Sequence, residues 1–466
     1  MGGVFGCVSK NDCVPQVYYG TDYHSHLGTR RGGMAVMNGG DCQRSIHNIE
    51  NDYFRSKFES DLNKFQGNKG IGVISDTDPQ PLVIGSHLGT FAIVTVGRIN
   101  NIEQLTRKAL SKRQFFTETR CMATNPTELT AMLICQEASF EDGIRRVLDS
   151  IEGSCSLLLL TEDGIWAARD KLGRTPLVVG RGNDSFAVAS ENCSFPNLGF
   201  STEYFLGPGE AVFISPEGFE KRLPARKDMQ VCSFLWIYYG YPASSYEGIN
   251  VETVRYRCGS ALAARDPHTL DLVAGIPDSG VGHAIGYANE KKIPYKRPFV
   301  KYTPTWPRSF MPQNQKVRDL VARMKLIPIE DIIRGQRILF CEDSIVRGTQ
   351  LAGTIQGVFQ AGAKEVHMRP ACPPLLYPCD FLNFSMSKSS IALAGRRAIM
   401  AIDGHLERVA QYADPDSEQH RAAVEWIRGQ LGLTSLSFQR IDDMVKAIGI
   451  EKSRLCTHCW DASSYF

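Results

Sequence analysis

Two adjacent acids followed by a short loop of small and polar residues form the segment with the clearest chemical pattern. Glu342 and Asp343 come first, and the loop from Ser344 to Thr349 follows, with Gly348 near its end. A glycine lets backbone N–H groups approach a ligand closely, and the N–H groups at the start of a helix favour an anion such as phosphate. Two carboxylates would repel a bare phosphate. The pattern therefore favours a ligand that also carries sugar hydroxyls and a divalent metal ion.

These residues stand at a predicted junction between a strand and a helix. The short apolar run Ile338–Cys341 is typical of a parallel strand that is buried on both faces, and residues 351–361 are predicted to be helical. A second loop, Gly275–Gly282, follows a predicted strand at 271–274 and precedes a helix that extends to about residue 287. Its Pro-Asp-Ser-Gly sequence is also that of an ordinary turn, so it indicates a ligand loop only because it follows a strand.

Strand, acidic pair, loop and helix in this order resemble the motif that binds 5-phosphoribosyl 1-pyrophosphate (PRPP) in type I phosphoribosyltransferases. The resemblance implies that Glu342 and Asp343 contact the ribose hydroxyls and that the following loop holds the 5-phosphate. It also implies a Mg²⁺ ion bound by Ser279, Glu342 and Asp343. The alternative is an ordinary strand–turn–helix junction with two solvated acids. The implied PRPP-binding residues are Asp278, Ser279, Gly280, Ser344, Ile345, Val346, Arg347, Gly348, Thr349 and Lys325.

A third segment, Pro298–Tyr302, resembles the strand that leads into the mobile catalytic loop of the same family. Where that loop normally carries Asn, Arg, Tyr and Gly, this chain has Tyr302-Thr-Pro-Thr-Trp-Pro307, and its two prolines stiffen the backbone. Lys301 and Arg308 remain as cations for the departing pyrophosphate. Lys325 is expected either to contact the diphosphate or to lie on a solvated helix face. The predicted catalytic residues are therefore Glu342, Asp343, Arg308 and Lys301.

Composition limits the class of protein. The chain has 466 residues, a formal net charge of +2, a hydrophobic fraction of 43% and 14 cysteines. This length predicts two or three domains, and the absence of a basic tract argues against nucleic acid as a partner. No apolar run approaches the ~20 residues of a membrane span, and the N-terminus lacks the pattern of a secretory signal. The cytoplasm is the expected location, where thiols serve metal sites, catalysis or the core.

The first half of the chain carries a second resemblance. Its landmarks resemble the glutaminase domain of the glutamine PRPP amidotransferase family, and their order matches across nearly the whole chain. The resemblance implies an α/β protein: a four-layer αββα domain of the N-terminal-nucleophile-hydrolase type at residues 1–230, then a type I phosphoribosyltransferase parallel-sheet domain at 231–466 with a C-terminal helical and cluster-binding segment. The landmarks are Met1–Gly6, Arg169–Leu177, Ala189–Glu191 and Pro208–Glu210.

The catalytic residues of that glutaminase domain are not present in this sequence. The family exposes an N-terminal Cys by removing Met and uses its thiolate against the glutamine amide, whereas this chain has Gly2. An oxyanion donor is typically worth ~3–4 kcal/mol, so we expect a degenerate domain that serves packing and oligomerisation, or docks an ammonia-supplying partner. The family's substrate-gripping arginine, oxyanion-hole Asn-Gly, glutamine-binding Asp and His-Arg-Gly segment fall on Val73, Val96-Gly97, Pro126 and His26-Leu-Gly28.

Cysteines suggest a metal centre. Cys456 and Cys459 form a Cys-x-x-Cys near the C-terminus, a spacing that by itself favours structural zinc. Cys232 and Cys379 fall where iron–sulfur members of the resembled family place their other two ligands. The resemblance therefore implies a structural [4Fe–4S] cluster on Cys232, Cys379, Cys456 and Cys459, with zinc as the alternative.

The resemblance as a whole implies an enzyme. The expected reaction is an amidophosphoribosyltransferase reaction that forms phosphoribosylamine and pyrophosphate from PRPP and ammonia, the first step of purine nucleotide synthesis, without use of glutamine. The alternatives are a regulatory protein that binds PRPP or nucleotides, and phosphoribosyl transfer to another amine. Expected partners are a second copy of the chain in a dimer or tetramer, an ammonia-supplying protein, and purine nucleotides as feedback ligands.

Overall fold

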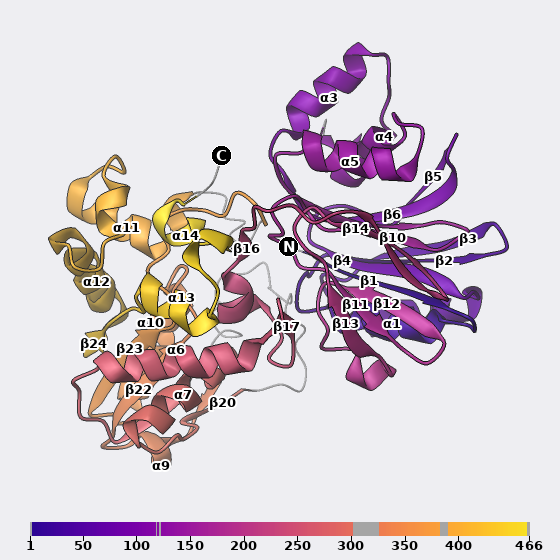
Figure 1. Ribbon diagram of the computed structural model, residues 1–466. Helices are drawn as coiled ribbons and strands as arrows, with labels where there is room; N and C mark the ends of the chain where they lie inside the picture. The colour runs from indigo at the N-terminus through magenta and orange to yellow at the C-terminus, as the bar shows by residue number, and fades with distance from the viewer. Residues whose placement is uncertain (1, 118, 121–122, 302–325, 383–389, 464–466) are drawn as a thin grey trace.

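The computed structural model describes residues 2–117, 119–120, 123–301, 326–382 and 390–463. The first domain consists of two antiparallel sheets packed face to face, with helices on both outer faces. Figure 1 shows these four layers, with α3, α4 and α5 above the sheets and α1 below them. The first sheet has the order β13 (Ser201–Phe205), β11 (Val178–Arg181), β12 (Ser185–Ala189), β1 (Gly2–Ser9), β4 (Lys69–Ser75), β2 (Arg31–Asn38) and β3 (Asp41–Asn48).

The second sheet has the order β15 (Gly218–Leu223), β14 (Ala211–Ser215), β10 (Ile165–Ala168), β9 (Gly153–Leu160), β6 (Gly89–Ile99) and β5 (Leu82–Ser86). Side chains alternate between the faces of each strand, as in β1, where Val4 and Val8 enter the core between the sheets while Phe5 and Cys7 pack under α1. The helices are α1 (Val14–Asp22), α2 (Phe54–Phe58), α3 (Ile102–Ser111), α4 (Pro126–Ile134) and α5 (Phe140–Ser150). A two-stranded ribbon pairs β7 (Thr119–Arg120) with β8 (Ala123–Thr124).

Local signals explain where the first-domain helices begin. The Asn125 side chain accepts from the backbone N–H groups of Thr127 and Glu128, and Pro126 occupies the first turn, which together fix the start of α4 at Pro126. Ser139 caps α5 in the same way by accepting from Asp142 N. These caps satisfy donors that a helix leaves unpaired at its start.

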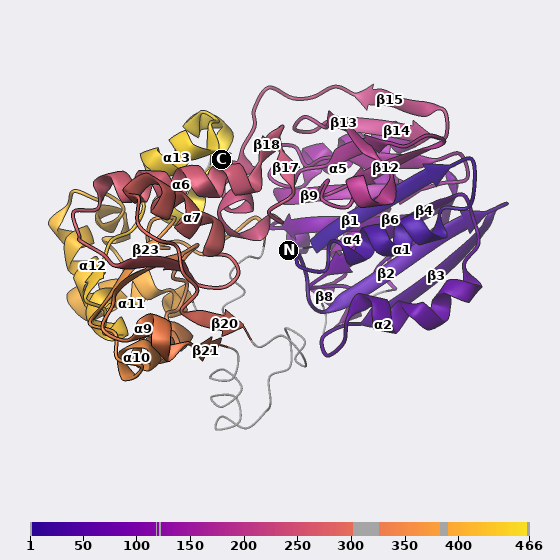
Figure 2. The same cartoon turned by 90° about the horizontal axis from the view of Figure 1, so that it is seen from below.

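The second domain is built on a parallel sheet. Its strand order is β19 (Leu272–Gly275), β22 (Arg337–Glu342), β23 (Glu365–Pro370) and β24 (Ser435–Leu436). Both faces are covered, which explains the continuous apolar run of β22. Helices α6 (Val251–Arg265) and α7 (Val281–Lys291) pack together on one face (Figure 2), and α13 (Ile441–Ile448) packs on α6. The core of the other face includes α10 (Thr349–Gln360), α11 (Ala394–Asp403) and α12 (Glu418–Leu431).

Short elements complete the second domain: β17 (Ser245–Tyr246) and β18 (Ile249–Asn250), β20 (Phe299–Lys301) and β21 (Leu326–Pro328), α9 (Glu330–Ile333) and α14 (His458–Asp461). At the junction of the two domains (Figure 1), β16 (Val231–Cys232) pairs in parallel with β25 (Leu455–Cys456). The predicted boundary at residues 230 and 231 falls between β15 and β16. The buried side chains of α12 are Ala423, Ile427 and Leu431. No helix among the described residues is both long and apolar enough to cross a membrane.

Candidate active site

The two predicted ligand loops lie beside each other because their strands are neighbours. In the parallel pair β19 and β22, Gly275 lies opposite Cys341, and Ile276 N donates to Cys341 O at 3.0 Å. A Cβ atom built on Gly280 would lie 2.3 Å from Cys341 O, so only glycine allows the loop after β19 to approach β22 this closely. The peptide bond between Pro277 and Asp278 is cis. Both loops therefore leave the carboxyl edge of the sheet at one place, where ligands of open α/β sheets bind.

Glu342, the first acid of the pair, lies in an environment that opposes its ionisation. Burial raises the pKa of Glu342 well above its usual range, the adjacent carboxylate of Asp343 raises it further, and a hydrogen bond with Ser279 opposes the shift. Asp343 is buried, and its Oδ2 accepts from Ser344 Oγ at 2.6 Å. Two close carboxylates of this kind are stabilised by hydroxyl donors or a cation. Ser279, Glu342 and Asp343 are thus brought together, as the sequence predicted.

The loop after the acidic pair is fixed from two sides. The side chain of Ile345 is buried in the core, while Val346 and Arg347 lie at the surface. The N–H of Ala394, the first residue of α11, donates to Val346 O at 2.8 Å, and the guanidinium of Arg397 donates to Arg347 O. The backbone at these positions is therefore held by a neighbouring helix.

Gly348 ends this loop with a left-handed backbone (φ 73°) and serves as the N-cap of α10. Glycine adopts this backbone without strain, and the N-terminus of α10 that follows it has unpaired N–H groups of the kind that bind phosphate. Thr349 begins α10, and its side chain lies outside the described part of the structure.

Lys301 is the predicted cation whose position the structure describes. Its Nζ lies 2.6 Å from Asp278 Oδ2, and both side chains are largely exposed. An exposed pair of this kind contributes little to stability, so Lys301 can exchange its partner for a diphosphate at low cost. Arg308, Lys325 and the segment 302–307 lie outside the described residues.

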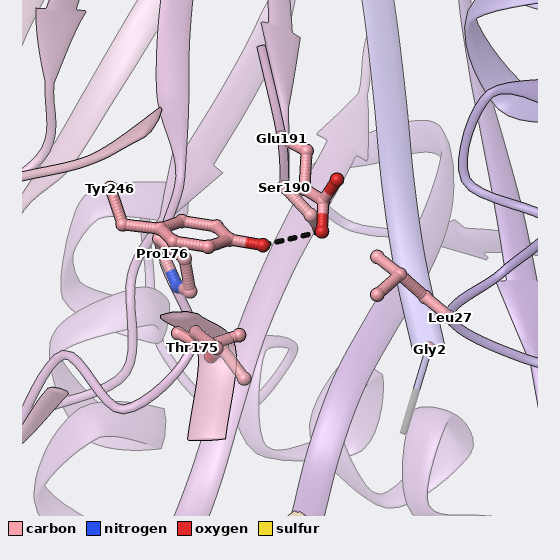
Figure 3. A pocket seen from close by; sticks show the side chains of 8 residues that line it. Gly2, Leu27, Thr175, Pro176, Ser190, Glu191 and Tyr246 are labelled. Atoms are coloured by element: carbon pink, nitrogen blue, oxygen red, sulfur yellow. Dashed lines mark hydrogen bonds between the residues drawn. The ribbon is translucent and has the colours of Figure 1, made fainter. Parts of the chain in front are cut away.

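A second polar centre lies in the first domain around Gly2. Gly2 pairs with Ser75, and its Cβ position faces the core between the sheets. A Cβ atom built there would lie 2.6 Å from Ile74 O and 3.0 Å from Val96 Cγ1. The cavity beside Gly2 has a volume of only about 10 Å³, which holds about one water molecule (Figure 3). Its walls are Leu27, Thr175, Pro176, Ser190, Glu191, Leu235 and Tyr246.

Glu191, a residue of the first domain, forms part of the wall of this cavity and contacts the second domain. Its carboxylate accepts from Ser244 Oγ at 2.7 Å, from Tyr246 OH (Figure 3) and from Tyr241 N at 3.3 Å, and it lies 3.1 Å from His26 Nε2. Burial raises the pKa of Glu191, but the charge of His26 and these hydrogen bonds outweigh it and lower the pKa to about 2. Glu191 is therefore a charged, buried contact between the two domains.

The four cysteines of the predicted cluster meet at the domain junction. Cys232 lies opposite Cys456 in the β16–β25 pair, and Cys459 shares a side-chain hydrogen bond with Cys379. Leu376 N and Tyr377 N donate to Cys459 O at 3.0 and 3.1 Å, and Leu382 N donates to Cys379 Sγ at 3.3 Å. All four side chains are buried. Burial raises the pKa of the Cys232 and Cys456 thiols, and the hydrogen bond with Cys379 together with burial raises the pKa of Cys459. Within the described ranges, no three His, Cys, Asp or Glu side chains are arranged to hold one metal ion.

Comparisons with known proteins cover almost the whole chain. It is 32% identical over 481 residues to the amidophosphoribosyltransferase of Synechocystis sp., a match that covers 98% of this chain and 90% of that enzyme. The chain belongs to the amidophosphoribosyltransferase family. Its identity to the Methanocaldococcus jannaschii amidophosphoribosyltransferase is 29%, with 98% of this chain and 96% of that enzyme covered. Residues 69–197 match the family described as a glutamine amidotransferase domain.

Solved structures of the family confirm the predicted fold. The glutamine PRPP amidotransferase from B. subtilis, complexed with ADP and GMP, superposes with a TM-score of 0.86 at 27% identity and covers 99% of this chain and 97% of its own. A structure described as the allosteric regulatory enzyme of purine biosynthesis gives a TM-score of 0.85 at 28% identity, with 99% and 96% covered. The expected pairing of a four-layer domain with a parallel-sheet domain is thus correct.

Within the amidophosphoribosyltransferase fold, one sequence alignment needs correction. Val73 lies opposite Val4, inside the core between the sheets, and the residue opposite Gly2 is Ser75. Val96 adjoins Gly2, and Pro126 is the first residue of α4. The sequence marked Glu191 only as a family landmark. Its contact with the second domain could not be found from sequence, because Ser244 and Tyr246 lie more than fifty residues away in the chain.

Proposed function

We propose that this chain is an amidophosphoribosyltransferase that takes its nitrogen from ammonia, either free or supplied by a partner protein, and not from glutamine. The observation that carries the proposal is the packing around Gly2. The residue there has no nucleophilic atom, and the carbonyl of Ile74 occupies the space that a Cβ atom would need. Ser75 stands opposite, and a cavity of about 10 Å³ is far too small for an amino acid.

The transferase site, by contrast, retains its acids and loops. In the proposed reaction, the lone pair of ammonia attacks C1 of the PRPP ribose while the bond from C1 to the pyrophosphate oxygen breaks. The bonding electrons leave with pyrophosphate, and the new ammonium group loses a proton to solvent. Glu342 and Asp343 would accept hydrogen bonds from the ribose hydroxyls and fix the ring for attack. The loop from Ser344 to Gly348 and the start of α10 would hold the 5-phosphate.

Magnesium fits the residues at this edge of the sheet. Glu342 and Asp343 are adjacent carboxylates, burial raises the pKa of Glu342, and Ser279 lies within hydrogen-bond reach of Glu342. Mg²⁺ usually takes one or two protein carboxylates and completes its shell with substrate phosphates and water. Ser279, Glu342 and Asp343 would therefore hold the ion together with PRPP. When bound, the ion supplies positive charge against the departing pyrophosphate.

The four cysteines fit a metal centre, because their thiols lie in one buried region and Leu382 N donates to Cys379 Sγ, the kind of contact that supports a metal-bound thiolate. Their places in the chain match those of the ligands in iron–sulfur members of the family, which favours a cluster over a zinc ion. We assign a structural [4Fe–4S] cluster to Cys232, Cys379, Cys456 and Cys459, which would tie the C-terminal segment to β16.

The proposed use of ammonia also determines which partners we expect. A site that cannot release ammonia from glutamine depends on free ammonia or on a protein that delivers it. We further propose that the chain forms a homo-oligomer and binds purine nucleotides as feedback ligands, as the B. subtilis complex with ADP and GMP suggests for a relative.

The test is pyrophosphate release from PRPP with Mg²⁺ and either ammonium or glutamine, using anaerobically purified protein. We expect turnover with ammonium that rises with pH, because the unprotonated amine is the nucleophile, and none with glutamine. The Glu342→Gln variant is the control for contaminating enzymes and should lower the ammonium activity by about ten- to a hundredfold. Equal turnover with glutamine would overturn the nitrogen-source assignment. Failure with every amine would favour a regulatory PRPP-binding protein instead.

A further inference from the structure

A pocket of about 420 Å³ opens at the junction of the domains, separate from the PRPP loops and from Gly2. It lies beside the β16–β25 pair, because its walls include the residues that directly precede both strands. The hydrogen bond from Gln230 N to Leu172 O (2.7 Å) closes one side. This volume lies within the usual range of ligand sites. The walls are Leu172, Lys227, Asp228, Met229, Gln230, Ser453 and Arg454.

One wall of the pocket has a buried donor without a partner. The side chain of Gln230 is almost fully buried, and its Oε1 accepts from Arg174 Nη2 at 3.1 Å. Arginine only donates, so this contact fixes which end of the amide is oxygen. The Nε2 at the other end has no hydrogen-bond partner. An unpaired buried donor costs free energy, and a ligand that brings an acceptor removes that cost.

The charges around the pocket favour an anion. Arg454 Nη2 donates to Met229 Sδ at 3.6 Å, a weak acceptor, and neither Arg454 nor Lys227 forms an ion pair within the described part of the chain. Asp228 is the single acid in the wall, so the wall carries a net positive charge.

We propose that this pocket binds a small organic anion, either a phosphate ester or a carboxylate. Arg454 and Lys227 would bind its oxyanion, Gln230 Nε2 would donate to it, and the buried side chains of Leu172 and Met229 would contact its carbon skeleton. The ligand would join the linker before β16 to the segment before β25. Because it contacts both, its binding stabilises the junction that holds the cysteines.

The experiment is calorimetric titration of the full-length, anaerobically purified protein with glycerol 3-phosphate and with citrate. We expect one of the two to bind at this site. Tighter binding of glycerol 3-phosphate identifies a phosphate-ester site, and tighter binding of citrate identifies a carboxylate site. Arg454→Gln or Lys227→Gln should each weaken binding by about ten- to a hundredfold, as for a lost charge-assisted hydrogen bond. Asp228→Asn should tighten it, because the variant removes the opposing charge.

Lys452→Gln is the matched control. Lys452 lies two residues from Arg454 but pairs with Asp461 and does not line the pocket, so this variant should bind like the parent. The proposal is overturned if neither probe, at millimolar concentration, gives heat of binding or a shift in melting temperature. The same holds if binding is unchanged in the Arg454 and Lys227 variants, or if Asp228→Asn weakens it. Thermal unfolding of each variant without ligand verifies that the fold is kept.

Discussion

Gly2→Cys is expected to destabilise the first domain without creating a glutaminase. The new Cβ atom would start 2.6 Å from Ile74 O, and because ordinary contacts begin near 3.4 Å, strand β1 or β4 must move by several tenths of an ångström. The neighbouring atom is backbone in a paired strand, so it cannot move as a flexible side chain would. Overpacking of this kind costs about 1–3 kcal/mol. For a domain of this size the apparent melting temperature should fall by about 2–12 °C.

The assay combines thermal unfolding with ammonia release from glutamine. Gly2→Ala adds the same Cβ atom without a thiol, and alanine adopts the backbone conformation of Gly2 without strain. Any loss of stability in this variant therefore comes from the Cβ contact, and it should be similar to the loss in Gly2→Cys. Gly218→Ala is the matched control, because a Cβ atom there meets nothing within 4 Å. Mass spectrometry establishes whether Met1 has been removed from each variant. A Gly2→Cys protein that keeps its melting temperature and releases ammonia from glutamine would refute the reasoning from packing.

Four variants, one of them followed across a pH profile, test other parts of the account. Glu342→Gln should lower kcat/KM for PRPP by about ten- to a hundredfold without lowering the free energy of unfolding, because it weakens charge-assisted contacts to the ribose and removes a buried charge. Tyr246→Phe should lower the free energy of unfolding in urea by about 1–3 kcal/mol, since it leaves the Glu191 carboxylate short of a donor. The pKa of Glu191 in the folded protein is about 2, below its usual value of 4.5, so the charged carboxylate stabilises the fold above pH 4.5. This contribution to the free energy of unfolding, about 3 kcal/mol, is lost as the pH falls towards about 2. Glu191→Gln should flatten the profile in that window, and an unchanged profile would contradict the assignment. Cys379→Ser should reduce both iron and sulfide in anaerobic preparations, whereas zinc in the parent protein would contradict the cluster.

The transferase half was predictable because its signals are local. Each loop follows its own strand directly, so the order of strand, acids, glycine and helix can be read from a few adjacent residues. What sequence could not give was the distance between the loops. That distance depends on β19 lying next to β22, and on the close approach that Gly280 allows to Cys341.

The register of the strands in the first domain is a clearer case of a feature that sequence could not predict. A shift of two residues along a strand keeps a side chain on the same face, so Val73 and Ser75 are equally plausible neighbours of Gly2 until the register is known. Glu191 and the pocket at Gln230 depend on contacts between segments far apart in the chain. Hydrophobic pattern and local motifs carry no signal for such contacts, which arise when the two domains pack.

Competition between the two nitrogen sources tests the central claim most directly. The protein receives PRPP and Mg²⁺ together with ¹⁵N-ammonium and unlabelled glutamine, and the isotope content of the phosphoribosylamine product, trapped as it forms, is measured by mass spectrometry. The packing around Gly2 predicts that the product carries ¹⁵N alone, at every ratio of the two donors. Product that carries nitrogen from glutamine, in an amount that grows with glutamine concentration, would contradict the account.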